Sequence, residues 1–512
     1  MKNGYDIILF TEYANEHISC KLLGPYQLSS FLRSKGFSVL VVDHVSRYSK
    51  AEMYMIAKLA CGDNTLFVGI SNTMSLPKDE ISFTHCGLEF DKIFVEAFKA
   101  VNPNVKIVVG GAHARSNTSN PFLDYSVLGY AEMSAWRLAK HLRDPLEPLG
   151  PHFVNEHGVK ILTDRKADGY DFTQTVNMWC DDDIMMPGEV LPIESARGCI
   201  FKCKFCAYPM NGKKKLDYLR DQKQVKYELE RNYELYGITD YFIVDDTFNE
   251  SDEKLRMFAE VSASLPFELN FRCYLRLDLL ANNYDQVKLL ADAGLRGTFF
   301  GIETLSNAAG KIIGKSTNSE KLIETLQRIR SDYGDTIMTS SGFIIGLPEE
   351  TLDECWNSYQ RIVSGEVPLH NIGFQPLRIT RPDSFAWNSE FGVNFKSYGY
   401  EEMQLSDVTS EEDKKMFSSM FLEHVPWKNN LTNVFEANKL SEKIMADFAT
   451  HENLVPSSNQ VFFARNYNIS ELLTNKTIKN YDFLDLKDKN VKQYKLKLMK
   501  YLTVKSKELN VR

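Results

Sequence analysis

The sequence lacks the features that mark several specialised classes of protein. Its 512 residues include no low-complexity segment and no internal repeat, which favours ordinary globular domains. Every apolar run is shorter than the roughly 20 residues that a transmembrane helix needs, and the first run is too short for a secretory signal. The nine cysteines are odd in number and scattered, unlike a disulfide framework. We therefore expect a cytoplasmic protein without a membrane span.

The chain also has no excess of positive charge. Its formal net charge is −8, which argues against a protein whose whole surface binds nucleic acid. Hydrophobic residues make up 43% and charged residues 25% of the chain, as in other globular proteins. The length predicts roughly two to four domains with large hydrophobic cores.

Three cysteines stand close together in the middle of the chain. Cys199, Cys203 and Cys206 follow the spacing Cys-x3-Cys-x2-Cys, after a short apolar strand at residues 191–193. Three thiolates can hold three corners of an iron–sulfur cube and leave the fourth iron open for chemistry. A zinc knuckle would need a second cysteine pair or histidines nearby, and the next cysteine, Cys273, lies far downstream. Three unrelated buried cysteines are the other alternative.

The residues around these cysteines resemble a known family signature. An aromatic residue, Phe205, precedes the third cysteine, and Arg197-Gly198 precedes the first. This pattern resembles that of the radical S-adenosylmethionine family. The resemblance implies that the three cysteines are the metal ligands of a catalytic 4Fe–4S cluster, whose open iron binds S-adenosylmethionine. One electron, from a donor such as flavodoxin or ferredoxin, would then yield a 5′-deoxyadenosyl radical that abstracts hydrogen from an unreactive carbon of an unknown substrate.

Residues 1–145 alternate apolar strands with amphipathic helices. We expect strands at residues 5–10, 37–43, 65–71, 105–111 and 125–129, with helices between most of them. Such alternation predicts an α/β, Rossmann-like domain with a doubly wound parallel sheet. Ligands of these sheets bind at the carboxyl ends of the strands.

Three phrases of this domain, LGPYQLSSFLRSKGFSVLVVD, VKIVVGGAHA and DYSVLGYAEMSAWRLAKHL, resemble a cobalamin-binding type of domain that precedes many radical S-adenosylmethionine modules. The usual cobalt-ligand motif, Asp-x-His-x-x-Gly, is absent, and His17 in the equivalent loop at residues 11–23 is not assigned as a ligand. Two alternatives stay open. Bound cobalamin would imply methylation of an unreactive carbon, and a domain without cobalamin would favour rearrangement or oxidation.

The three cysteines of the N-terminal domain raise a further alternative. The methylthiotransferase branch of the family binds a second cluster through three cysteines in such a domain. Here the candidates are Cys20, Cys61 and Cys86, but their flanking sequences do not match that branch. Buried cysteines also commonly serve as small hydrophobic residues.

Residues 146–190 are expected to be an ordered linker, and the strand–helix alternation resumes at residue 191. Six strand–helix units between residues 191 and 380 match the partial (β/α)6 TIM barrel of the family. In such barrels the catalytic groups lie at the carboxyl ends of the strands.

Two strand ends carry further motifs of the family. Residues 342–349, GFIIGLPE, fit the pattern Gly-x-Ile-x-Gly-x-x-Glu. Gly342 and Gly346 would let the strand edge approach a flat ring, and Ile344 would pack on the adenine of S-adenosylmethionine. The phrase FFGIE resembles a strand of the cobalamin-associated subgroup and ends at Glu303.

Charged residues at the strand ends have open roles. Glu303 could bind the ammonium or ribose hydroxyls of S-adenosylmethionine, or pair with Arg276. Arg276 could instead pair with the methionine carboxylate of S-adenosylmethionine. Asp245 and Asp246 resemble an acidic pair of the family, with a role in either substrate binding or structure.

Residues 381–512 are expected to be a mainly helical C-terminal region. Residues 471–512 hold eleven Lys or Arg against five Asp or Glu, a net charge of +6. This tail could contact RNA, an acidic protein or a lipid headgroup, and a solvated helix face is the simpler interpretation. For the whole chain, a non-catalytic cobalamin or redox sensor is the alternative to an enzyme, but the complete cysteine triad favours an enzyme.

Overall fold

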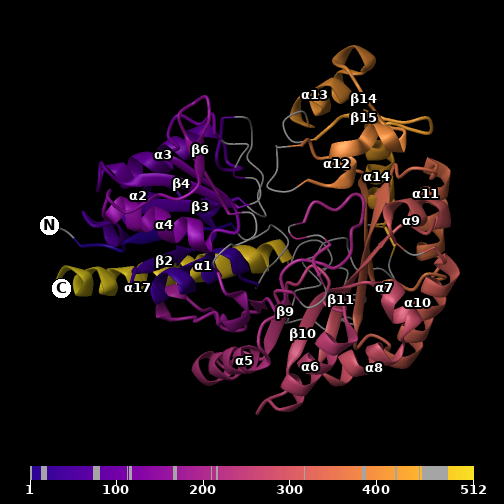
Figure 1. The fold of residues 1–512 in the computed structure, drawn as a ribbon, viewed down its shortest axis with the longest axis horizontal. Helices are drawn as coiled ribbons and strands as arrows, with labels where there is room; N and C mark the ends of the chain where they lie inside the picture. Colours follow the sequence, from indigo (N-terminus) through magenta and orange to yellow (C-terminus); the bar gives the residue numbers. More distant parts are fainter. Residues whose placement is uncertain are drawn as a thin grey trace.

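The computed structural model describes residues 3–12, 20–72, 81–111, 114, 118–164, 170–208, 210, 212–214, 217–315, 317–382, 388–420, 424–448, 450–451 and 483–511. Two lobes stand side by side, each built on a sheet whose strands are mainly parallel (Figure 1). We call the N-terminal unit the first lobe and the barrel with its attached helices the second lobe. The loop that contains His17 lies outside the described residues.

The first lobe contains the predicted doubly wound sheet. Its parallel strands lie in the order β2-β1-β3-β4-β5, so the strand order reverses at β1. The strands are short apolar runs, buried on both faces because helices cover the two sides of the sheet. The elements are β1 (Ile7–Phe10), α1 (Leu23–Ser34), β2 (Val39–Val42), α2 (Lys50–Ala60), β3 (Phe67–Ser71), α3 (Leu88–Lys99), β4 (Lys106–Gly111), β5 (Tyr125–Gly129) and α4 (Glu132–Arg143).

The segment expected to be a linker adds two strands to this sheet. β7 (Lys160–Asp164) pairs in parallel with β5, and β6 (His152–Val154) pairs antiparallel with β7. The turn between them contains Gly158 at φ 84°, a conformation that glycine adopts without strain. Residues 146–190 therefore belong in large part to the first lobe.

The second lobe is the predicted partial barrel. Its six strands are all parallel and lie in sequence order from β8 to β13. Asp221, Ser251 and Thr351 each cap the N-terminus of a helix with a side-chain hydrogen bond, as expected for strand–helix units. The elements are β8 (Leu191–Ile193), α5 (Gln222–Tyr236), β9 (Asp240–Ile243), α6 (Asp252–Ala263), β10 (Asn270–Leu275), α7 (Leu277–Asn282), α8 (Asp285–Asp292), β11 (Leu295–Glu303), α9 (Asn307–Ile313), α10 (Ser319–Tyr333), β12 (Met338–Ile345), α11 (Leu352–Val363) and β13 (Asn371–Pro376).

The C-terminal region is mainly helical, as predicted, but it divides between the lobes. α14 packs against β13 and α11 of the barrel, and the buried Trp427 donates from its indole nitrogen to Leu377 O at 2.7 Å. α17 instead returns to the first lobe and packs along α2 (Figure 1). The elements are α12 (Glu390–Asn394), β14 (Glu401–Glu402), α13 (Glu411–Met420), β15 (Trp427–Lys428), α14 (Val434–Phe448) and α17 (Phe483–Val511).

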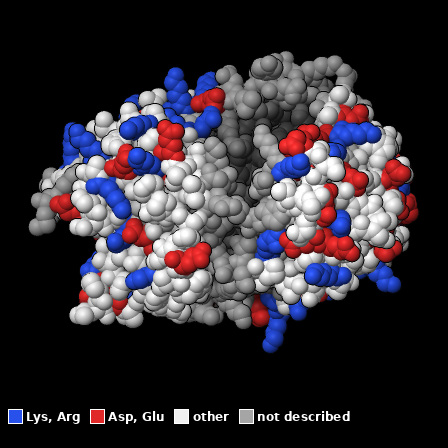
Figure 2. All heavy atoms as spheres, turned by 90° about the horizontal axis from the view of Figure 1, so that it is seen from above, with Lys and Arg blue, Asp and Glu red and all other residues white. Residues whose placement is uncertain are grey.

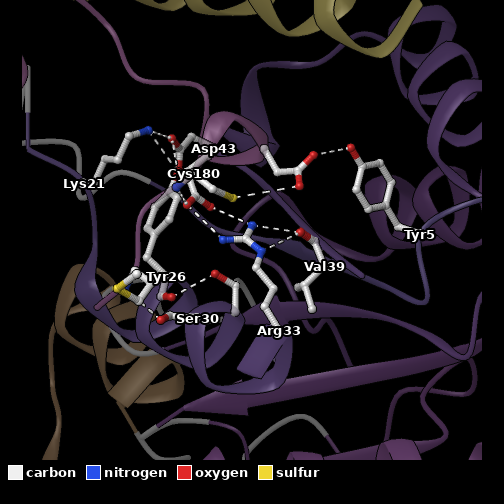
Figure 3. A network of polar contacts seen from close by, with 12 residues as sticks. Tyr5, Lys21, Tyr26, Ser30, Arg33, Val39, Asp43 and Cys180 are labelled. Atoms are coloured by element: carbon white, nitrogen blue, oxygen red, sulfur yellow. Dashed lines mark hydrogen bonds and ion pairs between the residues drawn. The ribbon is translucent and has the colours of Figure 1, made fainter. Parts of the chain in front are cut away.

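A buried polar network joins α17 to the first lobe. The Tyr494 hydroxyl of α17 accepts a 2.9 Å hydrogen bond from the Asp43 amide. The Asp43 carboxylate accepts from Lys21 at 2.8 Å and from the Tyr26 hydroxyl at 2.6 Å, and Figure 3 shows both side chains directed at it. Burial of a lysine and an aspartate is tolerated because each satisfies the other.

Charge on the described surface is mixed in sign. On the face shown in Figure 2, basic and acidic side chains are interspersed over both lobes. Within the described part of the tail, Lys495 pairs with Glu52 at 2.6 Å and Lys497 donates to Met185 O. Contact of the tail with nucleic acid or an acidic protein stays a prediction. Among the described residues, no helix is both long enough and apolar enough to cross a membrane.

Candidate functional site

The three predicted cysteines lie on one loop that follows β8. All three are free thiols, with Cys203 buried and Cys199 and Cys206 half-buried. The Cys206 amide donates to Cys203 O at 3.1 Å, which turns the chain between the last two thiols. In the described chain, no three His, Cys, Asp or Glu side chains converge closely enough to hold one ion. A cubane cluster binds each thiolate at a separate iron corner, so it does not need three ligands to converge on one ion.

Asp245, at the end of β9, determines the path into this loop. Its carboxylate accepts from the amides of Ser195 and Ala196 at 2.6 and 3.1 Å. Lys254 of α6 lies 2.7 Å from the same carboxylate, and both side chains are buried. Asp245 therefore has a structural role, one of the two alternatives that the sequence left open.

A second acid, Glu250, holds the middle and the end of the loop. It accepts from the Ile200 amide at 3.3 Å and pairs with Lys213 at 3.1 Å. Lys213 also donates to Arg197 O at 2.7 Å, so it ties together the two sides of the cysteine loop. Sequence reasoning missed Glu250, Lys213 and Lys254, because nothing in their local pattern marks a buried ion pair.

Two polar contacts reach the thiols directly. Thr247 Oγ1 lies 3.2 Å from Cys199 Sγ, and Arg276 Nη1 donates to Cys203 Sγ at 3.4 Å. The guanidinium of Arg276 also pairs with Asp278 at 2.6 Å and lies over the Phe201 ring at 4.0 Å. Arg276, which follows β10, thus reaches the cysteine loop from a neighbouring strand end.

Glu303, at the end of β11, lies on the same side of the barrel. Its carboxylate pairs with Lys315 at 3.4 Å rather than with Arg276. Glu303 has φ 69°, a left-handed conformation that is uncommon outside glycine and often marks a functional position. Lys315 Nζ also lies 5.9 Å from the centre of the Phe205 ring. The structure thus brings Phe205, Arg276 and Glu303 around the cysteine loop.

Gly342, in β12, and Gly346, just after it, are needed for packing within the chain. The sequence had instead suggested that they make room for the flat ring of a ligand. A Cβ at Gly342 would lie 3.0 Å from the Phe299 ring, and one at Gly346 would lie 2.2 Å from the Trp427 ring. Gly346 also has φ 91°. These glycines therefore make room for aromatic side chains of this chain. Ile344, between them, is half-buried.

A cavity of about 470 Å³ lies between the two lobes, beside the cysteine loop. Its first-lobe side is formed by the carboxyl ends of β1, β3, β4 and β5, where the strand order reverses, as expected for ligand sites of such sheets. Four glycines make this edge shallow: Gly69, Gly110, Gly111 and Gly129. The second lobe contributes Glu194, Ala196, Arg197, Ala207, Tyr208, Val244 and Asp246.

Burial raises the pKa of an acidic group both at the cavity and in the cysteine loop. Burial, together with the charges of Glu194 and Asp245, raises the pKa of Asp246 to about 7. Burial also raises the pKa of Cys206 to about 12. A bound metal centre would reverse the shift at the cysteine, because metal ligands must be deprotonated.

The structure separates the three N-terminal cysteines. Cys61 follows α2 beside the start of β1, because Tyr5 there donates to Ala60 O at 2.9 Å. Cys20 lies at the opposite, carboxyl edge, next to the Lys21–Asp43 pair. Cys20 and Cys61 are buried and Cys86 is half-buried. The second-cluster alternative is therefore wrong for these residues, and Cys20 and Cys61 serve as buried small side chains.

Part of the chain is similar in sequence to known proteins. Residues 193–362 match the model of the radical SAM superfamily. The chain is 24% identical over 278 residues to the uncharacterized methyltransferase PH0819 of Pyrococcus horikoshii, which covers 50% of this chain and 57% of that protein. The chain thus matches little more than half the length of that relative.

Two solved structures share the fold over most of the chain. TsrM, a radical S-adenosylmethionine methyltransferase from Kitasatospora setae solved with cobalamin and a [4Fe–4S] cluster, has a TM-score of 0.64 and 16% identity, over 96% of this chain and 100% of that one. The cobalamin-dependent radical enzyme OxsB with aqua-cobalamin has a TM-score of 0.54 and 15% identity, over 98% of this chain and 81% of that one. These likenesses confirm the predicted fold.

Proposed function

We propose that this chain, whose residues 193–362 form a radical SAM domain, is a cobalamin-dependent enzyme that methylates an unreactive carbon. The observation that carries the proposal is the cavity that joins the glycine-lined edge of the first sheet to the cysteine loop. An accessory cofactor in the first lobe and a cluster in the second would face each other across this cavity. TsrM, which shares the fold, was solved with both groups.

The cysteine loop would hold a 4Fe–4S cluster. Cys199, Cys203 and Cys206 would supply the thiolates, and Arg276 donates to the Cys203 sulfur at 3.4 Å. S-adenosylmethionine would bind at the strand ends beside the loop, near Phe205, Glu303 and the β12 segment with Gly342, Ile344 and Gly346. The cluster, when bound, supplies the electron that cleaves S-adenosylmethionine.

The first lobe would hold cobalamin. The glycine-lined edge suits a flat macrocycle, because Gly69, Gly110, Gly111 and Gly129 line the cavity without side chains. Apolar side chains such as Phe10, Leu28 and Phe67 line the same cavity and would exclude water. Cobalamin, when bound, would supply the methyl-transfer chemistry.

The residues of the chain bind, orient and shield these groups. Asp246 and Glu194 give the second-lobe side of the cavity hydrogen-bond acceptors for a substrate. We also propose that flavodoxin or ferredoxin supplies the electron, since radical SAM chemistry needs a reductant. A reducing cytoplasm would suit both the free cysteines and an oxygen-sensitive cluster.

The test is anaerobic purification of the full chain, reconstitution with iron, sulfide and hydroxocobalamin, and incubation with a low-potential reductant and S-adenosylmethionine labelled in its methyl group. The reductant is needed because the cobalt of hydroxocobalamin is Co(III) and accepts a methyl cation only after reduction to Co(I). We expect about four irons and one corrinoid per chain, and labelled methylcobalamin. Four irons with no corrinoid after reconstitution would contradict the methylase proposal and favour rearrangement or oxidation. Zinc in place of iron would contradict the radical chemistry.

A further inference from the structure

Arg197 connects the cysteine loop to the first lobe. It precedes Cys199 by two residues and is 3% exposed. Its Nη2 lies 2.5 Å from the Glu132 carboxylate at the start of α4, in the first lobe. Its Nε lies 3.1 Å from Glu194, which follows β8 in its own lobe. A single buried side chain therefore makes ion pairs with both lobes.

Aromatic rings keep this guanidinium in place. Its central carbon lies 4.4 Å from the centre of the Tyr130 ring, 4.6 Å from that of Phe172 and 5.3 Å from that of Tyr170. Stacking on rings and forked pairing with carboxylates are properties of arginine that lysine does not share. Arg197 thus has one defined position between the lobes.

The backbone of Arg197 is tied to the barrel separately. Its carbonyl accepts from Lys213 at 2.7 Å. The next residue, Gly198, has φ 74°, and a Cβ there would lie 2.6 Å from Met210 Cβ. The backbone between Arg197 and Cys199 therefore has little freedom to absorb a movement of the Arg197 side chain.

The ion pair also lies at the cavity. Arg197, Glu132, Tyr130 and Gln27 all line it. With its amide oriented to satisfy both neighbours, Gln27 accepts from Arg197 at 2.6 Å and donates to Glu194 at 3.3 Å. Within the described chain, Arg197 Nη1 and Glu132 Oε2 are buried without a hydrogen-bond partner. A buried network that is only partly satisfied is sensitive to small displacements.

We propose that the Arg197–Glu132 pair is a positioning contact that couples occupancy of the cavity to the geometry of the cysteine loop. A macrocycle against the first-lobe edge would press on Tyr130 and Glu132, and Arg197 would pass this displacement to Cys199 through Gly198. The inference rests on the proposed cluster and corrinoid sites, and it adds a residue that acts on the cluster without being its ligand.

The test uses the full chain with Glu132→Gln, which keeps the shape and removes the charge. The matched control is Asp183→Asn, since Asp183 is a buried acid that pairs with Arg33 at 2.8 Å, within the first lobe (Figure 3 shows Arg33). The first measurement is hydrogen–deuterium exchange of residues 198–208 in the chain without iron or corrinoid. The second is the ⁵⁷Fe Mössbauer spectrum of the oxidised, reconstituted cluster with and without hydroxocobalamin.

We expect Glu132→Gln to speed exchange in the loop by at least ~10-fold, while Asp183→Asn leaves the loop as in the wild type. We also expect hydroxocobalamin to change the Mössbauer spectrum of the wild type and of Asp183→Asn, but not that of Glu132→Gln, with iron and corrinoid still bound. A purely structural contact would leave the spectral response intact.

Two results would overturn the inference: equal loop exchange in both variants, or a Glu132→Gln spectrum that responds to hydroxocobalamin as the wild type does. Failure of the proposed function has a different signature. A wild-type chain that binds no iron or no corrinoid would contradict that function, and the exchange comparison on the cofactor-free chain would still decide the role of Glu132. If Glu132→Gln does not fold, Arg197→Lys replaces it in the test. Lysine keeps the positive charge but lacks the planar guanidinium that pairs with Glu132 and Glu194 at once.

Discussion

The Lys254 ammonium lies 2.7 Å from the Asp245 carboxylate, and this buried pair holds the turn that leads into the cysteine loop. Asp245 lies two residues after the end of β9 and accepts from the amides that follow β8, so the two strand ends share one acid. The neighbouring Glu250 accepts from Lys254 as well, at 3.4 Å. The loop that carries the thiols is thus anchored by buried ion pairs inside the barrel.

Lys254→Met tests how much the Lys254–Asp245 ion pair contributes to stability. Removing one partner of a buried ion pair leaves an uncompensated charge, so we expect the free energy of unfolding to fall by about 3–5 kcal/mol. Equilibrium urea unfolding measures the change. The control is Lys288→Met, which removes an exposed pair with Asp292 and should leave the free energy of unfolding close to that of the wild type. Equal losses in the two variants would contradict the role of Asp245.

Replacement of any one of the three loop cysteines by serine tests the cluster. We expect Cys203→Ser to bind less than about half of the wild-type iron and to form no 5′-deoxyadenosine, because two thiolates hold a cube poorly. Iron analysis and chromatography of the reaction products measure this. The control is Cys273→Ser, since Cys273 is fully buried in β10 outside the loop. Wild-type iron and turnover in Cys203→Ser would exclude the loop as the cluster site.

Gly346→Ala tests the close packing between the carboxyl end of β12 and the Trp427 ring. Alanine would be strained at φ 91°, and its Cβ would overlap the Trp427 ring. We expect a loss of at least about 2 kcal/mol in the free energy of unfolding and weaker binding of S-adenosylmethionine. Denaturation and equilibrium dialysis measure the two effects. Gly373, on the neighbouring strand β13, has no atom within 4 Å of an added Cβ, so Gly373→Ala should be tolerated.

His370 gives the second lobe a pH-dependent stability. Its Nδ1 accepts from the Thr339 amide at 3.0 Å, and burial with the nearby Arg330 lowers its pKa from 6.5 to about 4. Below pH 6.5 His370 becomes protonated in the unfolded chain, whereas in the folded chain it stays neutral until the pH approaches 4. The stability from neutral His370 is therefore complete above pH 6.5 and is lost as the pH falls toward 4, by about 1.4 kcal/mol per pH unit.

The measurement is urea unfolding of the wild type and of His370→Gln between pH 4 and pH 7. The variant has no proton to take up at this position, so its stability should fall less steeply with acid than that of the wild type. Parallel curves for the two proteins would show that His370 does not titrate between the folded and unfolded states.

The regular elements and the cysteine loop could be predicted because they depend on local pattern. Apolar runs bounded by glycine or polar residues predicted β5 and β8 with their observed bounds, and β1 to β4 with bounds within two residues of those observed. The cysteine spacing identified the loop because three thiols within eight residues are a chemical signal in themselves.

Tertiary pairing could not be predicted in the same way. Lys254 occupies a helix position where lysine is ordinary, and only the fold brings it to Asp245. The β6–β7 hairpin was hidden by surrounding prolines and charges, because edge strands carry little apolar pattern. The sequence singled out Gly346 as a cofactor-binding position, but the ring beside it belongs to Trp427, which lies 81 positions further along the chain.

The position of α17 has a consequence for biosynthesis. Tyr494, Leu498 and Leu502 complete the hydrophobic core that also contains residues of β1 and α2. A ribosome makes this helix only after the whole barrel has been synthesised, so the N-terminal lobe emerges first with part of its core exposed. The second lobe can therefore fold completely before the core of the first lobe is complete. We therefore expect chaperones to bind the newly made N-terminal lobe for longer than the second lobe.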